Sequence, residues 1–303
     1  MPVIEVCDLH KRYGDKVAVQ NVSFTVERGE IFGMLGPNGA GKTTTVECVA
    51  GLRAADGGSI SVLGLDPIRD RRALQKRLGI QLQESAIQNR LQVAEALDLY
   101  SSFYENPADW EELLDRLGLT SHRNVPYGKL SGGQKQRLSI ALALVGNPEI
   151  AVLDELTTGL DPQARRDTWA LIEGVRDAGV TVILVTHFME EAQRPCDRVA
   201  VIDAGKVVAL DTPEGLASHV GAENRLYFRP SRPVDESTLR ALPEVSQVRI
   251  AADGLVSITG NEHVVQAVMS MLARNHIVAG DLRVDQASLD DAFVALTGHD
   301  PVE

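Results

Sequence analysis

The stretch that decides the fold reads Gly36-Pro37-Asn38-Gly39-Ala40-Gly41-Lys42-Thr43. It fits the pattern of a phosphate-binding loop, in which a glycine and four further residues precede Gly-Lys-Thr. The apolar segment 31–35 before it has the character of a buried strand, and residues 44–50, which begin with Thr44, can continue as a helix as far as Gly51. Because the motif requires a strand before it and a helix after it, this context predicts a loop that binds a nucleoside triphosphate.

The residue types of this loop explain how it holds an anion. Glycines allow consecutive backbone N–H groups to turn inward around a polyphosphate, and the following helix presents its partially positive N-terminus to the same anion. Lys42 supplies a charge for the β- and γ-phosphates, and Thr43 offers a hydroxyl to Mg²⁺. The alternative is a glycine-rich turn that binds nothing, and the flanking strand and helix argue against it.

Length and composition indicate a globular protein of two domains. The chain has 303 residues, which exceeds the usual size of one domain, and 44% of them are hydrophobic. The net charge is −12, and residues 223–303 contain 12 acidic residues against seven Arg and no Lys, so the acidity extends over both parts of the chain. Since a nucleic-acid-binding protein usually carries a basic surface, we expect no nucleic-acid partner.

The cysteines and the hydropathy of the chain indicate its compartment. Cys7, Cys48 and Cys196 are far apart and show no metal-ligand spacing, which is typical of reduced thiols in a cytosolic protein. The first residues are acidic and begin a strand rather than a signal peptide. No apolar run approaches the length needed to cross a bilayer, so any membrane spans would belong to another chain.

The pattern of residues 1–220 predicts an α/β domain with a helical insertion at about 85–146, in which Gly118 ends one of the helices. Continuous apolar runs at 150–153 and 180–185 are typical of parallel strands buried on both faces. The other expected elements are strands at 4–9, 22–26 and 59–62, a turn at 11–14, a helix at 73–78 that ends at Gly79, and a hairpin at 198–210.

Residues 222–303 predict a second, accessory or regulatory domain. From about residue 224 the order of expected elements is strand, helix, strand, strand, helix, strand, which is the ferredoxin-like α+β pattern. A last helix is expected from Ser288 to Gly298, where Ser288 and Asp291 form a capping box. No group of catalytic residues is visible in this part of the sequence.

Two carboxylates follow the apolar run 150–153. Ligands bind at the carboxyl edge of open parallel sheets, so Asp154 and Glu155 are expected at such an edge. Asp154 can hold Mg²⁺ through water, and Glu155 can orient and deprotonate a water for attack on the γ-phosphate. An acid after an apolar run is common, and the assignment therefore depends on the phosphate-binding loop.

A second candidate anion site lies in Leu130-Ser131-Gly132-Gly133-Gln134, which opens a helix that extends through Leu144. A serine and two glycines at a helix N-terminus offer a hydroxyl, bare N–H groups and the helix dipole. The alternative is a helix cap without a ligand. We favour the anion site, because two phosphate-binding devices in one chain can serve one nucleotide.

The pentapeptide Leu-Ser-Gly-Gly-Gln, located between the phosphate loop and the Asp-Glu pair, resembles the signature of ATP-binding cassette (ABC) transporter ATPases. The resemblance covers residue 3 to about residue 220. It implies a P-loop NTPase cassette of α/β class, with a RecA-like core, an antiparallel β subdomain and a helical subdomain. It also implies ATP and Mg²⁺ as cofactors.

The same resemblance implies roles for four further residues. Tyr13 matches the aromatic residue that stacks on adenine. Gln83 matches the lid glutamine that meets Mg²⁺ and the attacking water, and its neighbour Gln81 is the second candidate. Asp161, in Thr158-Gly159-Leu160-Asp161, matches the loop where two cassettes touch, and His187 matches the switch histidine at the γ-phosphate. Glu155, His187 and Gln83 are thus the expected catalytic residues, and Thr43, Gln83 and Asp154 the expected metal ligands.

One residue departs from the family pattern, and three segments indicate a subtype. Leu156 stands where the family usually has proline, and the loss of a fixed φ should loosen the loop after Glu155. Segments 186–192, 211–213 and 287–298 resemble export ATPases of the daunorubicin-resistance type. In that group a short C-terminal domain follows the cassette, and the permease is a separate polypeptide with about six helical spans. This resemblance implies export of a drug, antibiotic or lipid-like molecule from the cytoplasmic face of the cell membrane.

The resemblance further implies that two copies face head to tail, with each nucleotide between the phosphate loop of one chain and residues 131–134 of the other. Hydrolysis would remove the γ-phosphate bridge and let the dimer open. Two alternatives stay open. One is a soluble ABC ATPase that acts on nucleic acid or ribosomes, which usually carries two cassettes, coiled coils or zinc modules. The other is a small-molecule kinase, which does not need the signature pentapeptide.

Overall fold

The computed structural model describes residues 2–81, 87–219, 224–251, 254–261, 263–285 and 289–298. The chain divides into two compact units, and the boundary lies between Pro213 and Glu214. Buried apolar side chains form a separate cluster within each unit.

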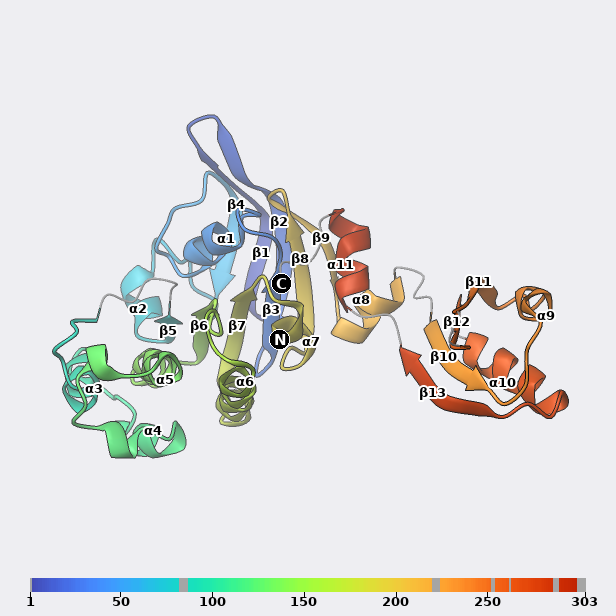
Figure 1. The fold of residues 1–303 in the computed structure, drawn as a ribbon. Helices are drawn as coiled ribbons and strands as arrows, with labels where there is room; N and C mark the ends of the chain where they lie inside the picture. The colour runs from blue at the N-terminus through green and yellow to red at the C-terminus, as the bar shows by residue number, and fades with distance from the viewer. Residues whose placement is uncertain are drawn as a thin grey trace. The chain divides into compact units, whose positions relative to one another are not determined.

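A six-stranded sheet forms the centre of the first unit (Figure 1). In spatial order its strands are β5 (Leu78–Gln81), β6 (Ile150–Asp154), β7 (Thr181–Thr186), β3 (Ile31–Leu35), β8 (Arg198–Asp203) and β9 (Lys206–Asp211). The first five strands are parallel, and β9 pairs antiparallel with β8. Every residue of β3, β6 and β7 is buried, as expected for continuous apolar runs in a sheet covered on both faces.

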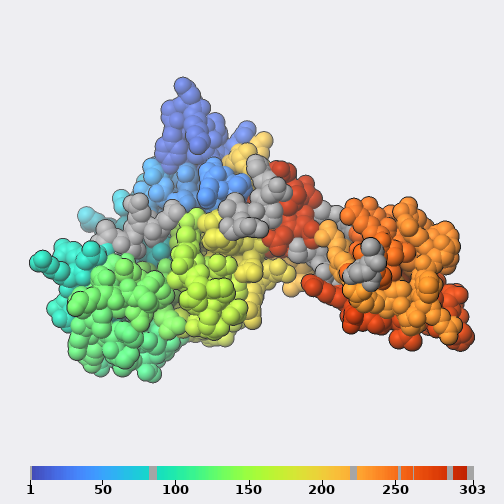
Figure 2. Space-filling view, viewed as in Figure 1, coloured from blue at the N-terminus to red at the C-terminus, as the bar shows by residue number. Residues whose placement is uncertain are grey.

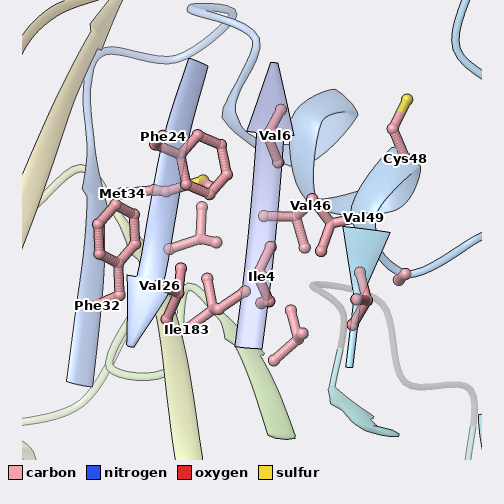
Figure 3. Close-up of a cluster of buried hydrophobic side chains, with 14 of the residues drawn as sticks. Ile4, Val6, Phe24, Val26, Phe32, Met34, Val46, Cys48, Val49 and Ile183 are labelled. Carbon is pink, nitrogen blue, oxygen red and sulfur yellow. The ribbon is translucent and has the colours of Figure 1, made fainter. Parts of the chain in front are cut away.

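One face of this sheet packs against a three-stranded antiparallel sheet and helix α1 (Lys42–Val49). The smaller sheet has the order β2 (Lys16–Glu27), β1 (Pro2–Tyr13) and β4 (Gly57–Val62). Figure 3 shows side chains from both sheets and from α1 in the cluster between them. Within it the rings of Phe24 and Phe32 stack with centroids 5.3 Å apart, a geometry that stabilises a core beyond simple burial.

Two sequence expectations for this region were wrong. Lys11 to Tyr13 were expected in a turn but belong to β1, and the turn occupies Gly14 and Asp15. Leu78 and Gly79 were expected at a helix end, but helix α2 (Arg71–Gln75) stops earlier and both residues lie in β5. Their pairing with β6 prevails over the local pattern, because a parallel ladder depends on a partner distant in sequence.

The helical insertion contains α3 (Val93–Ser101), α4 (Trp110–Arg116), the 3₁₀ helices η1 (Thr120–His122) and η2 (Tyr127–Lys129), and α5 (Gly132–Leu144). Gly118 follows α4 with φ of +63°, which confirms its role at the helix end. Figure 2 shows most of these residues, coloured teal to green, gathered in one lobe. Helices α5, α6 (Pro162–Asp177) and α7 (Met189–Gln193) contact the central sheet.

The second unit contains a four-stranded antiparallel sheet with the order β11 (Val245–Ile250), β12 (Val256–Gly260), β10 (Asn224–Pro230) and β13 (Ala279–Asp285). Its helices are α9 (Glu236–Arg240), α10 (Val264–Arg274) and α11 (Leu289–Thr297), and α8 (Pro213–His219) begins at the boundary. The chain order βαββαβ with this strand order is the ferredoxin-like arrangement expected from the sequence. Ser288, the expected cap of the last helix, lies outside the described residues.

None of the helices in the described ranges combines the length and apolarity that a membrane span requires.

Candidate nucleotide-binding site

The strand order brings the expected catalytic segments to one edge of the central sheet. Strand β7 lies between β3 and β6, and Leu35 pairs with Thr186 while Asp154 pairs with Val185. Because all three strands are parallel, the loops that follow them leave from the same edge. The phosphate-binding loop follows β3, Glu155 follows β6, and His187 follows β7.

The phosphate-binding loop, residues 36–43, has a backbone that requires glycine at Gly41. Its φ is +103°, and a Cβ there would lie 2.3 Å from the carbonyl oxygen of Ala18. The buried ammonium group of Lys42 donates hydrogen bonds to the carbonyl oxygens of Gly36 at 2.7 Å and Pro37 at 3.1 Å. Burial lowers the pKa of Lys42, while the carboxylates of Glu155 and Asp154 act in the opposite direction. The loop therefore holds a positive charge at the position where a polyphosphate would bind.

A cavity of about 360 Å³ opens beside this loop. Its lining includes Tyr13 and Lys16 from the β1–β2 hairpin, and Glu155 from the end of β6. The other lining residues are Ala18, Asn38, Gly39, Gly41, Lys42, Thr43 and Thr44. The structure thus places the expected adenine-stacking residue, most of the loop and the expected base around one space.

The side chains expected to hold Mg²⁺ lie next to the cavity. The hydroxyl of Thr43 is 3.3 Å from Oδ2 of Asp154, whose side chain is 1% exposed. Burial, reinforced by the adjacent Glu155, raises the pKa of Asp154 to about 6. Its second oxygen, Oδ1, has no hydrogen-bond partner in the described part of the chain. A buried carboxylate oxygen that accepts no hydrogen bond and lies beside a hydroxyl fits the oxygen-ligand chemistry of Mg²⁺.

Glu155 and His187 form a second polar pair at this edge. Nδ1 of His187 lies 3.1 Å from Oε1 of Glu155, and both side chains are only about a tenth exposed. Glu155 has φ of +50°, an uncommon value for a residue with a side chain, and its N–H donates to the carbonyl of Val185 at 2.8 Å. Strained backbone of this kind persists where the surrounding structure imposes it, often at functional sites.

The signature residues form the N-terminus of α5. The hydroxyl of Ser131 accepts from the N–H of Gln134 at 3.3 Å, and Oε1 of Gln134 accepts from the N–H of Ser131 at 2.9 Å. Gly132 and Gly133 belong to the first turn of the helix. This reciprocal capping box engages the N–H groups of Ser131 and Gln134, while Ser131 and Gly132 are exposed at the start of the helix.

Asp161 caps α6 beside the signature. Its carboxylate accepts from the N–H groups of Gln163 and Ala164, both at 3.0 Å, and these bonds hold the pKa of Asp161 below its usual range. A Cβ at Gly133 would lie 3.6 Å from Cβ of Ala164, so the N-termini of α5 and α6 are in contact distance.

The expected site residues therefore fall into two groups within one chain. In the first group, Tyr13, Glu155 and most of the phosphate loop line the cavity, and Asp154 and His187 contact the lining residues Thr43 and Glu155. The second contains Ser131–Gln134 and Asp161, which are not among the described residues that line this cavity. Ala40 is buried within the loop and accepts from the N–H of Gly205. Gln83 lies outside the described residues.

Two features of this region had no clear signal in the sequence. Glu191 in α7 is fully buried, and burial raises its pKa to about 7. Lys16 lines the cavity although nothing in the sequence singled it out. Leu156, at the position where proline was expected from the family, is fully buried and contributes to the core.

The central parallel sheet, the glycine-rich loop at its edge and the two carboxylates after β6 define a nucleoside triphosphatase of the phosphate-loop class. The model of the ABC transporter family matches residues 19–158. A Nod factor export ATP-binding protein I from Ralstonia nicotianae is 33% identical over 99% of this chain and 95% of its own length. The chain belongs to the ABC transporter family.

Other relatives match over similar lengths. The linearmycin resistance ATP-binding protein LnrL of Bacillus subtilis is 33% identical over 98% of both chains. The daunorubicin resistance ATP-binding protein DrrA3 of Streptomyces coeruleorubidus is 34% identical over 98% of this chain and 96% of its own. This chain is accordingly the ATP-hydrolysing subunit of an ABC exporter, as the sequence predicted.

Solved cassettes share the fold. The cbiO1 structure from Clostridium perfringens, part of the ABC transporter complex cbiONQ, is 27% identical with a TM-score of 0.66 over 72% of this chain and 91% of that one. A dimeric post-hydrolysis state of the cassette MJ0796, bound to ADP and Pi, is 26% identical with a TM-score of 0.62 over 69% and 98%. Both confirm the cassette architecture expected from the sequence.

Proposed function

We propose that two copies of this chain bind ATP and Mg²⁺ in composite sites and drive export of a drug, antibiotic or lipid-like molecule through a separate permease. The observation that carries the proposal is the division of the site into two groups. The cavity group offers Lys42 and the loop to a polyphosphate, whereas the exposed N-terminus of α5 at Ser131, beside the capped end of α6 at Asp161, offers a second set of anion contacts.

A head-to-tail homodimer would use both groups at once. In such a pair, the N–H groups and hydroxyl at Ser131–Gln134 of one chain reach the γ-phosphate of ATP held by the loop of the other, and a two-fold axis creates two equivalent sites. The γ-phosphate then joins the two chains, so its removal favours the open state. The dimeric cassette MJ0796 bound to ADP and Pi supports this arrangement.

Thr43 and Asp154 are the described residues that would hold Mg²⁺, and Gln83 is the third ligand that we expect. When bound, the ion neutralises charge on the β- and γ-phosphates. The unpartnered Oδ1 of Asp154 supports this assignment, because a buried carboxylate oxygen needs a cation or a donor.

Glu155 acts as the base in the proposed reaction. It lines the cavity and is held by Nδ1 of His187, so it is positioned to orient a water and take its proton. His187 adds a contact to the γ-phosphate, and Tyr13 stacks on the adenine ring.

The relatives named for Nod factor export, linearmycin resistance and daunorubicin resistance support the proposed class of cargo. We expect the permease to be a separate chain of about six helical spans, with this subunit on the cytoplasmic face of the membrane. Residues 1–220 would act as the cassette and 222–303 as an accessory or regulatory domain. The chain's net charge of −12 does not favour the alternative of an ABC ATPase that acts on nucleic acid or ribosomes.

The size of the purified Glu155→Gln protein, measured by light scattering with and without ATP and Mg²⁺, tests the composite site. We expect a monomer that becomes a dimer only with ATP, because the variant binds the nucleotide but does not cleave it. Adding Ser131→Arg should prevent this dimer by filling the space for the γ-phosphate. If the size of the protein does not depend on ATP, or if the Ser131→Arg variant still dimerises, the composite site is contradicted. Co-purification with a co-expressed permease tests the membrane partner.

A further inference from the structure

A chain of hydrogen bonds connects a histidine in the helical insertion to the signature residues. His122 ends η1 and is partly buried. Its Nε2 lies 2.8 Å from Nε2 of Gln134, and its Nδ1 lies 3.0 Å from the hydroxyl of Ser121. The contact with Gln134 joins η1 to the first turn of α5.

The capping box fixes the direction of these hydrogen bonds. Oε1 of Gln134 accepts from the N–H of Ser131, so the amide cannot be reversed without placing its NH₂ group against that N–H. The NH₂ group therefore faces His122 as a donor, and Nε2 of the imidazole must accept. The ring proton then sits on Nδ1, where the Ser121 hydroxyl is the acceptor. Of the three protonation states of the ring, only this neutral one satisfies every contact.

We infer that His122 is a positioning residue for the signature. Its neutral Nδ1–H form holds the amide of Gln134, and Gln134 in turn holds Ser131 and the N-terminus of α5 in the geometry that a partner's γ-phosphate would meet. This inference rests on the composite site proposed above. Protonation at Nε2 would set one N–H group against another, and Gln134 would have to turn and release the N–H of Ser131.

The other charged groups near η1 have partners of their own. On α4, Glu111 pairs with Arg123 at 3.3 Å, and Asp115 accepts from the hydroxyl of Thr120 at 3.5 Å. On α5, the ammonium group of Lys135 lies over the ring of Tyr127, and Arg137 pairs with Asp167 at 3.3 Å. Within the described ranges, His122 is the titratable group that hydrogen-bonds the side chain of Gln134.

Two substitutions of His122 test whether Gln134 needs a hydrogen-bond acceptor at this position. His122→Gln can keep an oxygen acceptor for Gln134, whereas His122→Arg presents only donors. In the Glu155→Gln background, we expect His122→Arg to weaken ATP-driven dimerisation at least tenfold at pH 8, and His122→Gln to change it less than threefold. His10→Gln in β1 is the matched control and should dimerise like the parent.

A direct measurement on the unsubstituted chain completes the test. Long-range ¹⁵N–¹H NMR spectra of histidine-labelled protein, with His122 assigned through His122→Gln, should show the Nδ1–H tautomer at pH 8. An Nε2–H tautomer, or a His122→Arg chain that dimerises like the parent, overturns the inference. If Ser131→Arg also dimerises normally, the composite site itself is wrong; if only His122→Arg does, the composite site stands and the positioning role falls.

Discussion

Nδ1 of His187 and Oε1 of Glu155 are 3.1 Å apart, although the two residues are separated by 32 positions in the chain. Their contact exists because β6 and β7 are adjacent parallel strands that end at the same edge. The imidazole therefore restrains the carboxylate that we propose as the base.

His187→Ala should lower ATP hydrolysis by about 10²-fold or more, because it releases the carboxylate of Glu155, and a general base typically contributes about 10²- to 10⁴-fold. ATP affinity should change little, because the loop and Lys42 are untouched. Phosphate release and titration with a fluorescent ATP analogue measure the two effects. Since the residues act as a unit, the double variant with Glu155→Gln should be no slower than Glu155→Gln alone. Additive losses would show that they act separately.

Lys42→Ala should weaken ATP binding by about 30-fold or more, which corresponds to about 2 kcal/mol for hydrogen bonds from a charged group. Isothermal titration calorimetry with the Mg²⁺ complex measures this affinity. Lys76→Ala is the control, because Lys76 is exposed and pairs with Glu105 away from the cavity. Equal affinities for the Lys42 variant and the parent would contradict the role of the loop.

Glu191→Gln should stabilise the first unit at alkaline pH. Burial raises the pKa of Glu191 from 4.5 to about 7, so the folded state holds the proton more tightly than the unfolded state. Stability from this group is complete below pH 4.5 and is lost as pH rises to 7, by up to about 3 kcal/mol. The neutral amide avoids that loss, and we expect a melting temperature about 5 °C higher at pH 8 and no difference at pH 4.

The exposed neighbour Glu190 provides the matched control for that experiment. Glu190→Gln removes a charge of the same sign one residue earlier, where solvent screens it, and should leave the melting temperature within about 1 °C. Equal shifts for both variants would mean that the net charge of the chain, rather than burial, produces the effect.

Gly41→Ala should damage nucleotide binding more than Gly39→Ala. Both residues have positive φ, which costs a residue with a side chain about 1–2 kcal/mol. At Gly41 the new methyl group would also lie 2.3 Å from the carbonyl oxygen of Ala18, whereas nothing lies within 4 Å at Gly39. We expect more than a tenfold loss of ATP affinity at Gly41 and a smaller loss at Gly39. The reverse order would show that the approach to Ala18 does not constrain the loop.

Deletion of residues 222–303 should leave a folded cassette that binds ATP. The buried cluster of the second unit, which includes Leu226, Phe228 and Leu272, is made of that unit's own residues, and the cluster of the first unit is complete without them. Circular dichroism melting and ATP titration of the shortened chain check this. Loss of cooperative melting would mean that the cassette depends on the second unit for its stability.

The strand ends and the phosphate loop could be predicted because each is marked by a short local sequence pattern, and the same pattern occurs at three strands. Runs of buried apolar residues end at Leu35, Leu153 and Val185, and the chemistry-bearing residues follow each run. For parallel strands, that pattern alone places the following loops at one edge. The separation of Ser131–Gln134 from the cavity agrees with the sequence argument that a second chain completes the site.

Other features could not be read from the sequence because they depend on contacts distant in the chain. Gly79 belongs to a strand because β6 pairs with it, and nothing in residues 73–78 indicates that partner. Glu191 sits in a segment whose charge suggests exposure, yet it is buried. His122 acquires its contact only where η1 meets α5. No local sequence pattern marks such residues, because their environment is made of side chains from other helices and strands.

The hydrogen bonds from Lys42 to Gly36 and Pro37 have a kinetic consequence. The ammonium group of Lys42 already holds the curved backbone through these two bonds. When a triphosphate arrives, Lys42 exchanges its two carbonyl acceptors for phosphate oxygens. The loop itself does not have to fold at that step, so it loses little conformational entropy. Nucleotide capture by this chain should therefore proceed at a rate set by diffusion and charge attraction, and the slow events of its cycle should come later, when two subunits meet and part.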